Sequence, residues 1–146
     1  MNKININCVA NKNAVIPEYK TPYAAGADLS ALLENPVTIN PGKFAVIPTG
    51  LFFEIPEGYE IQIRPRSGLA AKNGITVLNT PGTIDSDYRG ELKIVLINLG
   101  EKDFIINNGD RIAQMIIAPV IQSKFTIVEN LSQTERGTDG FGSTGI

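Results

Sequence analysis

Tyr59-Glu60-Ile61-Gln62-Ile63-Arg64 is the stretch that decides the fold, because apolar and polar residues alternate through it. Alternation with a period of two is typical of a strand with one wet face. Two further stretches, 92–97 and 112–117, are nearly continuous apolar runs rich in β-branched residues. These runs indicate strands that are buried on both faces or are covered by another subunit.

Turn signals separate these strands. Glycine and proline pairs such as Pro56-Glu57-Gly58 and Asn108-Gly109 recur about every eight residues from the middle of the chain. Nine prolines leave little room for helices, and the Ala/Leu-rich stretch 29–34 is ambiguous. One or two helical turns fit 67–74, where Ser67 would be the N-cap and Gly74 the terminating residue. The spacing predicts an all-β sandwich, jelly roll or barrel.

Composition excludes several classes of function. The chain has 146 residues, which fits one domain, and its net charge is −2. That charge is not the footprint of a nucleic-acid binder, so we expect no nucleic-acid partner. No run of about 18 apolar residues is present, so we expect no membrane partner. The polar start of the chain lacks the apolar stretch of a signal peptide, and we expect a cytoplasmic protein.

The missing residue types limit the chemistry further. The single cysteine, Cys8, excludes an internal disulfide and a CxxC site. The chain has no histidine, which excludes a Ser-His-Asp triad, an HExxH zinc site and an imidazole base. A catalytic base would therefore be a carboxylate, a lysine or a tyrosine. Any metal would be a hard cation on oxygen ligands, Mg²⁺ above all.

Arginines point to candidate anion sites. Arg66, Arg89, Arg111 and Arg136 each lie within two residues of a glycine. Arginine can grip phosphate through two hydrogen bonds, and glycine lets backbone N–H groups approach an anion. Arg66-Ser67-Gly68 is one such candidate. The alternative is a set of ordinary solvated turns and a helix cap.

Carboxylates offer candidate bases. Gly82-Thr83-Ile84-Asp85-Ser86-Asp87-Tyr88-Arg89-Gly90 places two carboxylates, a tyrosine and an arginine between glycines. It suits a turn that presents a base and an aromatic face, and the alternative is an acidic hairpin loop. Asp28 is a lone carboxylate in an apolar stretch. It could cap the following turn, which local sequence favours, or lie near a metal.

The last residues differ from the rest. Residues 133–146 contain four glycines and no apolar periodicity, so we expect a barrel domain over 1–132 followed by a flexible arm over 133–146. Gly140-Phe141-Gly142-Ser143-Thr144-Gly145 is a literal GxGxxG, but no strand precedes it and no helix can follow it. Its residues could wrap phosphate oxygens, with Arg136 pairing and Phe141 stacking on a planar ring. The alternative is an unstructured tail.

These segments together resemble the trimeric dUTP pyrophosphatases (dUTPases). Five motifs stand in that family's order and spacing and span residues 25–145. They are Ala25-Gly26-Ala27-Asp28-Leu29, Pro65-Arg66-Ser67-Gly68-Leu69-Ala70, residues 82–90, Gly109-Asp110-Arg111-Ile112-Ala113-Gln114, and residues 136–145.

The resemblance implies a fold and an assembly. The fold would be a jelly-roll-like β-barrel, and three chains would form a homotrimer with shared active sites. Each site would take the first, second and fourth motifs from one subunit and the third from another. The arm of a third subunit would close over it.

The resemblance also implies the reaction, hydrolysis of dUTP to dUMP and pyrophosphate. Asp85 would activate the water that attacks the α-phosphorus. Mg²⁺ would be chelated mainly by the triphosphate, with Asp28 touching its water shell. The reaction would remove dUTP and supply dUMP for thymidylate synthesis.

The implied substrate contacts fall into three groups. The phosphates would be held by Arg66, Ser67, Gly68 and Gln114, and from the arm by Arg136, Gly142, Ser143 and Thr144. Phe141 would stack over uracil, and Tyr88 would pack under the deoxyribose and exclude a 2′-hydroxyl. Backbone groups of a hairpin around the third motif would read uracil, at Asn79, Thr83, Ile84 and Lys93. The family usually has a small neutral residue where Asp139 stands, which predicts weaker closure of the arm.

Three alternatives stay open at this stage. A dCTP deaminase would share the fold but use a differently composed second motif and a catalytic glutamate. A regulatory protein could keep the fold and use a nucleotide only as a switch. A purely structural barrel subunit would have no nucleotide affinity.

Overall fold

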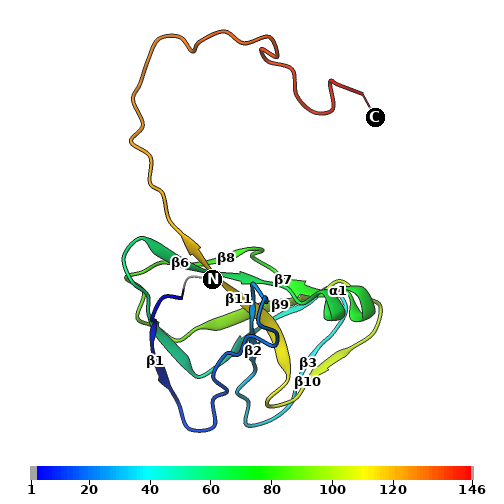
Figure 1. Cartoon of the computed structure of the whole chain (residues 1–146). Helices are drawn as coiled ribbons and strands as arrows, with labels where there is room; N and C mark the ends of the chain where they lie inside the picture. The colour runs from blue at the N-terminus through cyan, green and yellow to red at the C-terminus, as the bar shows by residue number, and fades with distance from the viewer. Residues whose placement is uncertain (1–2, 146) are drawn as a thin grey trace.

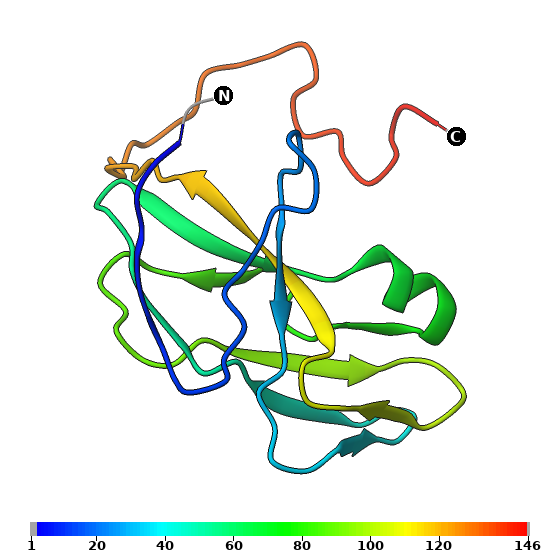
Figure 2. The same ribbon diagram turned by 60° about the horizontal axis from the view of Figure 1, so that its bottom comes forward.

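The structure, a computed structural model, describes residues 3–145. Its largest sheet is four-stranded and has the order β2 (Ala27–Ser30), β11 (Arg111–Pro119), β6 (Tyr59–Arg64) and β8 (Gly82–Ile84). Three smaller sheets complete the fold (Figures 1 and 2). They are β4 (Phe44–Pro48) with β9 (Lys93–Asn98) and β7 (Ile75–Val77), β1 (Asn7–Ala10) with β5 (Leu51–Glu54), and β3 (Val37–Ile39) with β10 (Phe104–Ile106). All pairings between these strands are antiparallel, and the fold is the expected jelly-roll-like β fold.

One apolar core joins the sheets. Its fully buried side chains include Leu51 of β5, Ile61 of β6, Leu96 of β9, Ile106 of β10 and Ile112 of β11. Since every sheet contributes side chains to this cluster, the sheets fold as one unit. The helical part of residues 3–145 is α1 (Ser67–Asn73), and no helix there is long and apolar enough to cross a membrane.

The strand predictions hold with one correction. In β6, Ile61 and Ile63 are buried while Gln62 is half-buried, as period-two alternation predicts. Of the two alternatives for the run 92–97, burial of both faces within one chain is wrong, and covering by another subunit stays a prediction. Ile94 and Leu96 point into the core, whereas Val95 and Ile97 on the other face are only half-buried. The ambiguous stretch 29–34 holds the end of β2 and no helix.

The helix begins one residue earlier than the predicted cap at Ser67 implies. Arg66, in an extended conformation, is the N-cap residue, and Ser67 is the first helical residue. No side chain caps this end, because the guanidinium of Arg66 has no hydrogen-bond acceptor to offer the first helical N–H groups. Gly74 ends the helix as predicted, with a φ of 67°, and the N–H of Gly74 donates to helix carbonyls.

Residues after β11 extend away from the body of the chain (Figure 1). Residues 121–139 are all exposed, and they contain no strand or helix. The strands thus end at Pro119, and the division of the chain at residue 132 stays a prediction.

Candidate functional site

Three neighbouring strands bring the first, second and fourth motifs together. In β11, Gln114 lies opposite Asp28 of β2 on one side and opposite Arg64 of β6 on the other. Directly opposed residues of antiparallel strands project from the same face of a sheet. Arg66 follows the end of β6, so the phosphate-binding candidates of all three motifs gather at one end of this sheet.

Asp28 lies at the centre of this group. Its Oδ1 is 3.2 Å from Nε of Arg66, and its Oδ2 is 3.0 Å from Nη1 of Arg111. Nη1 of Arg66 also donates to the backbone oxygen of Arg111 at 3.1 Å. The Asp28 side chain is only 17% exposed. The capping interpretation of Asp28 is therefore wrong, because its carboxylate is bound by two arginines from distant parts of the chain. We call Asp28, Arg66 and Arg111 the arginine–carboxylate cluster.

Gln114 is held beside this cluster. Its Nε2 donates to the backbone oxygen of Pro65 at 3.1 Å, immediately before Arg66. Gly26 makes room for the amide, because a Cβ at that position would clash with Oε1 of Gln114 and lie 3.1 Å from Cδ1 of Ile116. Ser67 and Gly68 follow Arg66 in the first turn of α1, and both are exposed.

The third motif forms a separate group. Asp85 is exposed, and its backbone oxygen accepts a hydrogen bond from the N–H of Tyr88 at 3.2 Å. The Tyr88 hydroxyl donates to the backbone oxygen of Glu91 at 3.0 Å, which fixes the ring against Gly90. This holds an aromatic face close to a carboxylate in one tight turn.

The expectation of a hairpin around this motif is wrong. β8 pairs with β6, whereas β9 pairs with β4 and β7, so the chain crosses from one sheet to another through 85–92. Thr83 and Ile84 lie in β8 and Lys93 begins β9. Asn79 is exposed before β8, and its Nδ2 is 3.3 Å from the place of a Cβ on Gly82. The two strands that flank the motif therefore belong to different sheets and do not pair with each other.

The two groups lie at opposite ends of β6. Ile84 pairs with Ile61, so Asp85 falls level with residue 60, whereas Arg66 lies beyond the other end of the strand. Six residues of extended chain separate the two levels, or about 20 Å at 3.3 Å per residue. A base must reach its proton directly or through one water. Asp85 and Arg66 of one chain therefore lie in separate groups, well beyond direct hydrogen-bond reach of each other.

The arm residues do not join either group within one chain. Phe141 is fully exposed, and Gly142, Ser143 and Thr144 are exposed with it. Arg136 is also exposed, and its Nε donates to the backbone oxygen of Asp139 at 2.9 Å. The proposed contacts of these residues with a nucleotide stay predictions.

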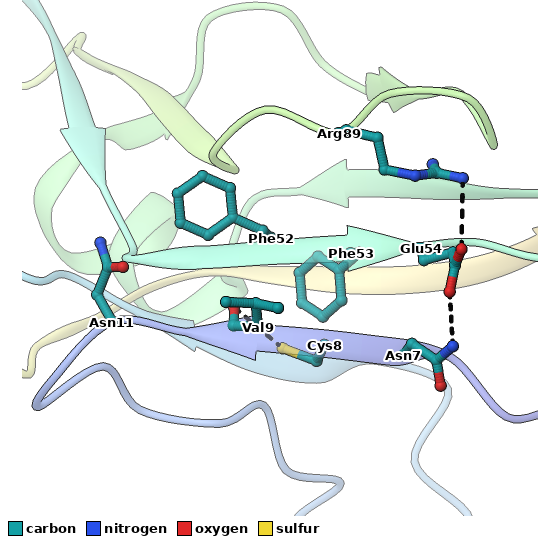
Figure 3. A pocket seen from close by; sticks show the side chains of 8 residues that line it. All are labelled: Asn7, Cys8, Val9, Asn11, Phe52, Phe53, Glu54 and Arg89. Carbon is teal, nitrogen blue, oxygen red and sulfur yellow. Dashed lines mark hydrogen bonds and ion pairs between the residues drawn. The ribbon is translucent and has the colours of Figure 1, made fainter.

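A hollow of about 490 Å³ lies elsewhere, between β1, β5 and the third motif (Figure 3). Phe52 and Phe53 line it together with Cys8 and Val9, and Arg89 is 3.9 Å from Glu54 at its edge. Burial raises the pKa of the Cys8 thiol, and a hydrogen bond from the backbone of Phe52 acts in the opposite direction. Of the arginines singled out in the sequence, only Arg89 lines this hollow, and none of the residues expected to contact the substrate does.

The site residues offer few ligands for a metal ion. Residues 3–145 contain no group of three or more acidic, cysteine or histidine side chains that could hold an ion. Asp28, whose two oxygens already accept from arginines, has lone pairs left for a water molecule. The donor set thus suits an Mg²⁺ ion carried by a polyphosphate and not one held in a protein cage.

Sequence reasoning left one residue of this site without a role. Arg111 stands in the fourth motif and was noted only for its nearby glycine. Its ion pair joins positions 83 residues apart, and no local pattern reveals such a contact. A lone carboxylate between apolar residues, in a chain with few arginines, is a signal that could have suggested it.

The chain is similar to known proteins of one family. A family model described as dUTPase matches residues 12–145. The deoxyuridine 5'-triphosphate nucleotidohydrolase of Treponema denticola is 62% identical over 135 residues, which cover 92% of this chain and 94% of that protein. A mutant of the Staphylococcus bacteriophage 80alpha dUTPase, solved with dUpNHpp, matches with a TM-score of 0.88 at 29% identity and covers 99% of this chain and 100% of its own.

A second similar solved structure is described with a bound metal ion. A mutant dUTPase from phage phi11 of S. aureus, described with a structural Mg(II) ion, matches with a TM-score of 0.78 at 26% identity. It covers 87% of this chain and 98% of its own. With the family model spanning nearly the whole sequence, the chain belongs to the dUTPase family.

Proposed function

We propose that this chain hydrolyses dUTP to dUMP and pyrophosphate. The observation that carries the proposal is the family match over residues 12–145, which includes every residue of the two groups described above. A dUTPase relative solved with dUpNHpp supports dUTP as the substrate. The reaction removes dUTP and supplies dUMP for thymidylate synthesis in the cytoplasm.

Asp85 is the proposed catalytic base. Its exposed carboxylate takes a proton from a water molecule, whose oxygen then bonds to the α-phosphorus. The bond between the α-phosphorus and the oxygen that bridges to the β-phosphate breaks, and pyrophosphate leaves. A chain without histidine has a carboxylate as its natural base for this step.

The arginine–carboxylate cluster and its neighbours would hold the phosphates. Arg66 offers a planar fork of donors, and Ser67, Gly68 and Gln114 add a hydroxyl, a backbone N–H and an amide beside it. Mg²⁺, chelated by the triphosphate and contacting Asp28 through water, would neutralise charge on the phosphates. The phage phi11 relative, described with a structural Mg(II) ion, supports a role for this metal in the family.

The third motif would select the nucleoside. Backbone groups at Asn79, Thr83, Ile84 and Lys93 would read uracil, since hydrogen-bond readout discriminates better than an apolar slot. Tyr88 would pack under the deoxyribose. Its hydroxyl is already bound to Glu91, so the ring is held in place to exclude a 2′-hydroxyl.

A homotrimer would complete the site. The separation of about 20 Å along β6 supports a site in which Asp85 of another copy would face the arginine–carboxylate cluster. The outward face of β4 and β9 supports an assembly, because Phe44 is 61% exposed and Val46 53% exposed beside the half-buried Val95 and Ile97. Exposed apolar patches of this kind mark interaction surfaces. The arm, residues 133–146, would reach a neighbouring site through Arg136, Phe141, Gly142, Ser143 and Thr144.

The test is pyrophosphate release in the presence of Mg²⁺, with dUTP, dCTP, dTTP and UTP compared. We expect release from dUTP alone, and its loss in a chain that ends at Thr134. Asp85→Asn should abolish turnover while dUpNHpp still binds. Ammonia from dCTP would indicate a deaminase instead, and nucleotide binding without release would indicate a regulatory protein.

A further inference from the structure

We propose that Arg111 is a positioning residue for the phosphate site, and that it acts through Asp28 on Arg66. The inference rests on the proposed function and assigns Arg111 a role in it. Asp28 would then have a second task besides any contact with metal-bound water. It holds two guanidinium groups at fixed places.

Two contacts within the chain hold the Arg66 guanidinium in place. Its Nε is bound to Asp28 and its Nη1 to the backbone oxygen of Arg111. A guanidinium has five N–H donors, so three remain free for a ligand. These two bonds fix the plane of the Arg66 guanidinium. Arg111 provides one partner, its backbone oxygen, and its side chain holds the other partner, the Asp28 carboxylate.

A β-bulge in β11 sets the direction of the Arg111 side chain. In the pairing of β11 with β2, Arg111 lies opposite Ser30 and Ala113 opposite Leu29, with a register shift between them. Ile112 is the extra residue, and Ile112 and Ala113 are both buried. Without the bulge, Arg111 would lie on the opposite face from Gln114, three positions away. The bulge turns it to the face of Asp28 and Gln114, which is how bulges re-aim side chains.

The arginine–carboxylate cluster has a net positive charge. Two guanidinium groups lie on either side of one carboxylate, so the cluster keeps a net charge of about +1 for an incoming phosphate. Substituting the Arg111 side chain keeps the backbone oxygen that Arg66 contacts, but it leaves the Asp28 carboxylate with Arg66 as its single partner and free to turn, so the anchor of the Arg66 Nε is loosened. The Arg111 side chain is 48% exposed, so its loss leaves no buried charge unpaired and should not unfold the protein.

The test measures phosphate binding directly, by calorimetry without Mg²⁺, with inorganic pyrophosphate and dUpNHpp as separate probes. Arg111→Gln should weaken the binding of each probe about tenfold, the loss of one charge-assisted interaction. Arg111→Lys should recover most of this loss, because the ammonium can still pair with Asp28. Lys43→Gln, an exposed change of the same charge, is the matched control and should bind as the wild type does.

A double-mutant cycle separates positioning from direct contact. If Arg111 acts through Arg66, then Arg111→Gln should change little in an Arg66→Gln background. Additive losses would overturn the proposal, as would unchanged pyrophosphate binding by Arg111→Gln with an unchanged unfolding midpoint. A wild-type chain that binds pyrophosphate but not dUpNHpp would contradict the proposed function and still test Arg111. A chain that binds neither probe would contradict both.

Discussion

Mixing two inactive variants tests whether the site is divided between chains. Arg66→Gln damages the arginine–carboxylate cluster that would bind the phosphates. Asp85→Asn removes the proposed base. Each variant alone should be inactive. The two positions lie about 20 Å apart in one chain. If each site takes Arg66 from one chain and Asp85 from another, a mixed assembly contains some sites in which both residues are intact.

The size of the recovery follows from random assembly. In an equal mixture, one half of the sites have an intact Arg66, and one half of those have an intact Asp85 from the neighbouring chain. About one quarter of the wild-type activity per site should therefore return, since each site in a symmetric oligomer draws on the same interface. The assay is pyrophosphate release from dUTP after the two chains are co-expressed or refolded together.

A second mixture serves as the matched control. Arg66 and Gln114 lie side by side in one chain, so Arg66→Gln mixed with Gln114→Ala leaves every site with one damaged residue. No recovery should occur there. If the Arg66→Gln and Asp85→Asn mixture stays as inactive as its components, the division of the site is refuted. Recovery in both mixtures would show that the return of activity does not come from combining Arg66 of one chain with Asp85 of another.

Three further predictions concern single positions. Gly26→Ala should displace the amide of Gln114, because the added Cβ clashes with Oε1, and should weaken dUpNHpp binding about tenfold in calorimetry; unchanged binding would contradict the role of Gly26. Leu96→Ala removes a fully buried side chain and should lower the free energy of unfolding by about 2–5 kcal/mol in urea; a loss below about 0.5 kcal/mol would mean that this part of the core is not packed as described. Because burial raises the pKa of Cys8, the folded state disfavours its thiolate, so stability should fall as pH rises above the thiol pKa of the unfolded chain. Alkylation by iodoacetamide should accordingly show a higher pH midpoint in the folded protein than in urea, and an equal or lower midpoint would refute this.

The strands were predictable where one face of a sheet meets water. Alternation in 59–64 identified β6, with Ile61 and Ile63 inward. The continuous run 92–97 was harder, because an apolar outward face can be covered by the same chain or by another. Val95 and Ile97 are half-buried in one chain, so their partner is not encoded in the local pattern.

The candidate site shows where local reasoning fails. Ser67 has the residue type and spacing of an N-cap, yet the helix starts after Arg66. Asp28 looks like a cap from its neighbours, yet its partners are Arg66 and Arg111. For Asp28, two long-range ion pairs take the place of a capping hydrogen bond, and sequence separation hides such pairs from local rules.

The position of β6 connects these observations. One strand carries the phosphate-binding residues at one end and lies level with Asp85 at the other, and an extended strand cannot fold back to bring its own ends together. Under the proposed function, such a chain would hold two half-sites that a second copy completes. The outward apolar face of β4 and β9, where Phe44 and Val46 remain exposed in one chain, would then be the surface that the second copy covers. Assembly and catalysis would depend on each other, and the mixing experiment tests that dependence directly.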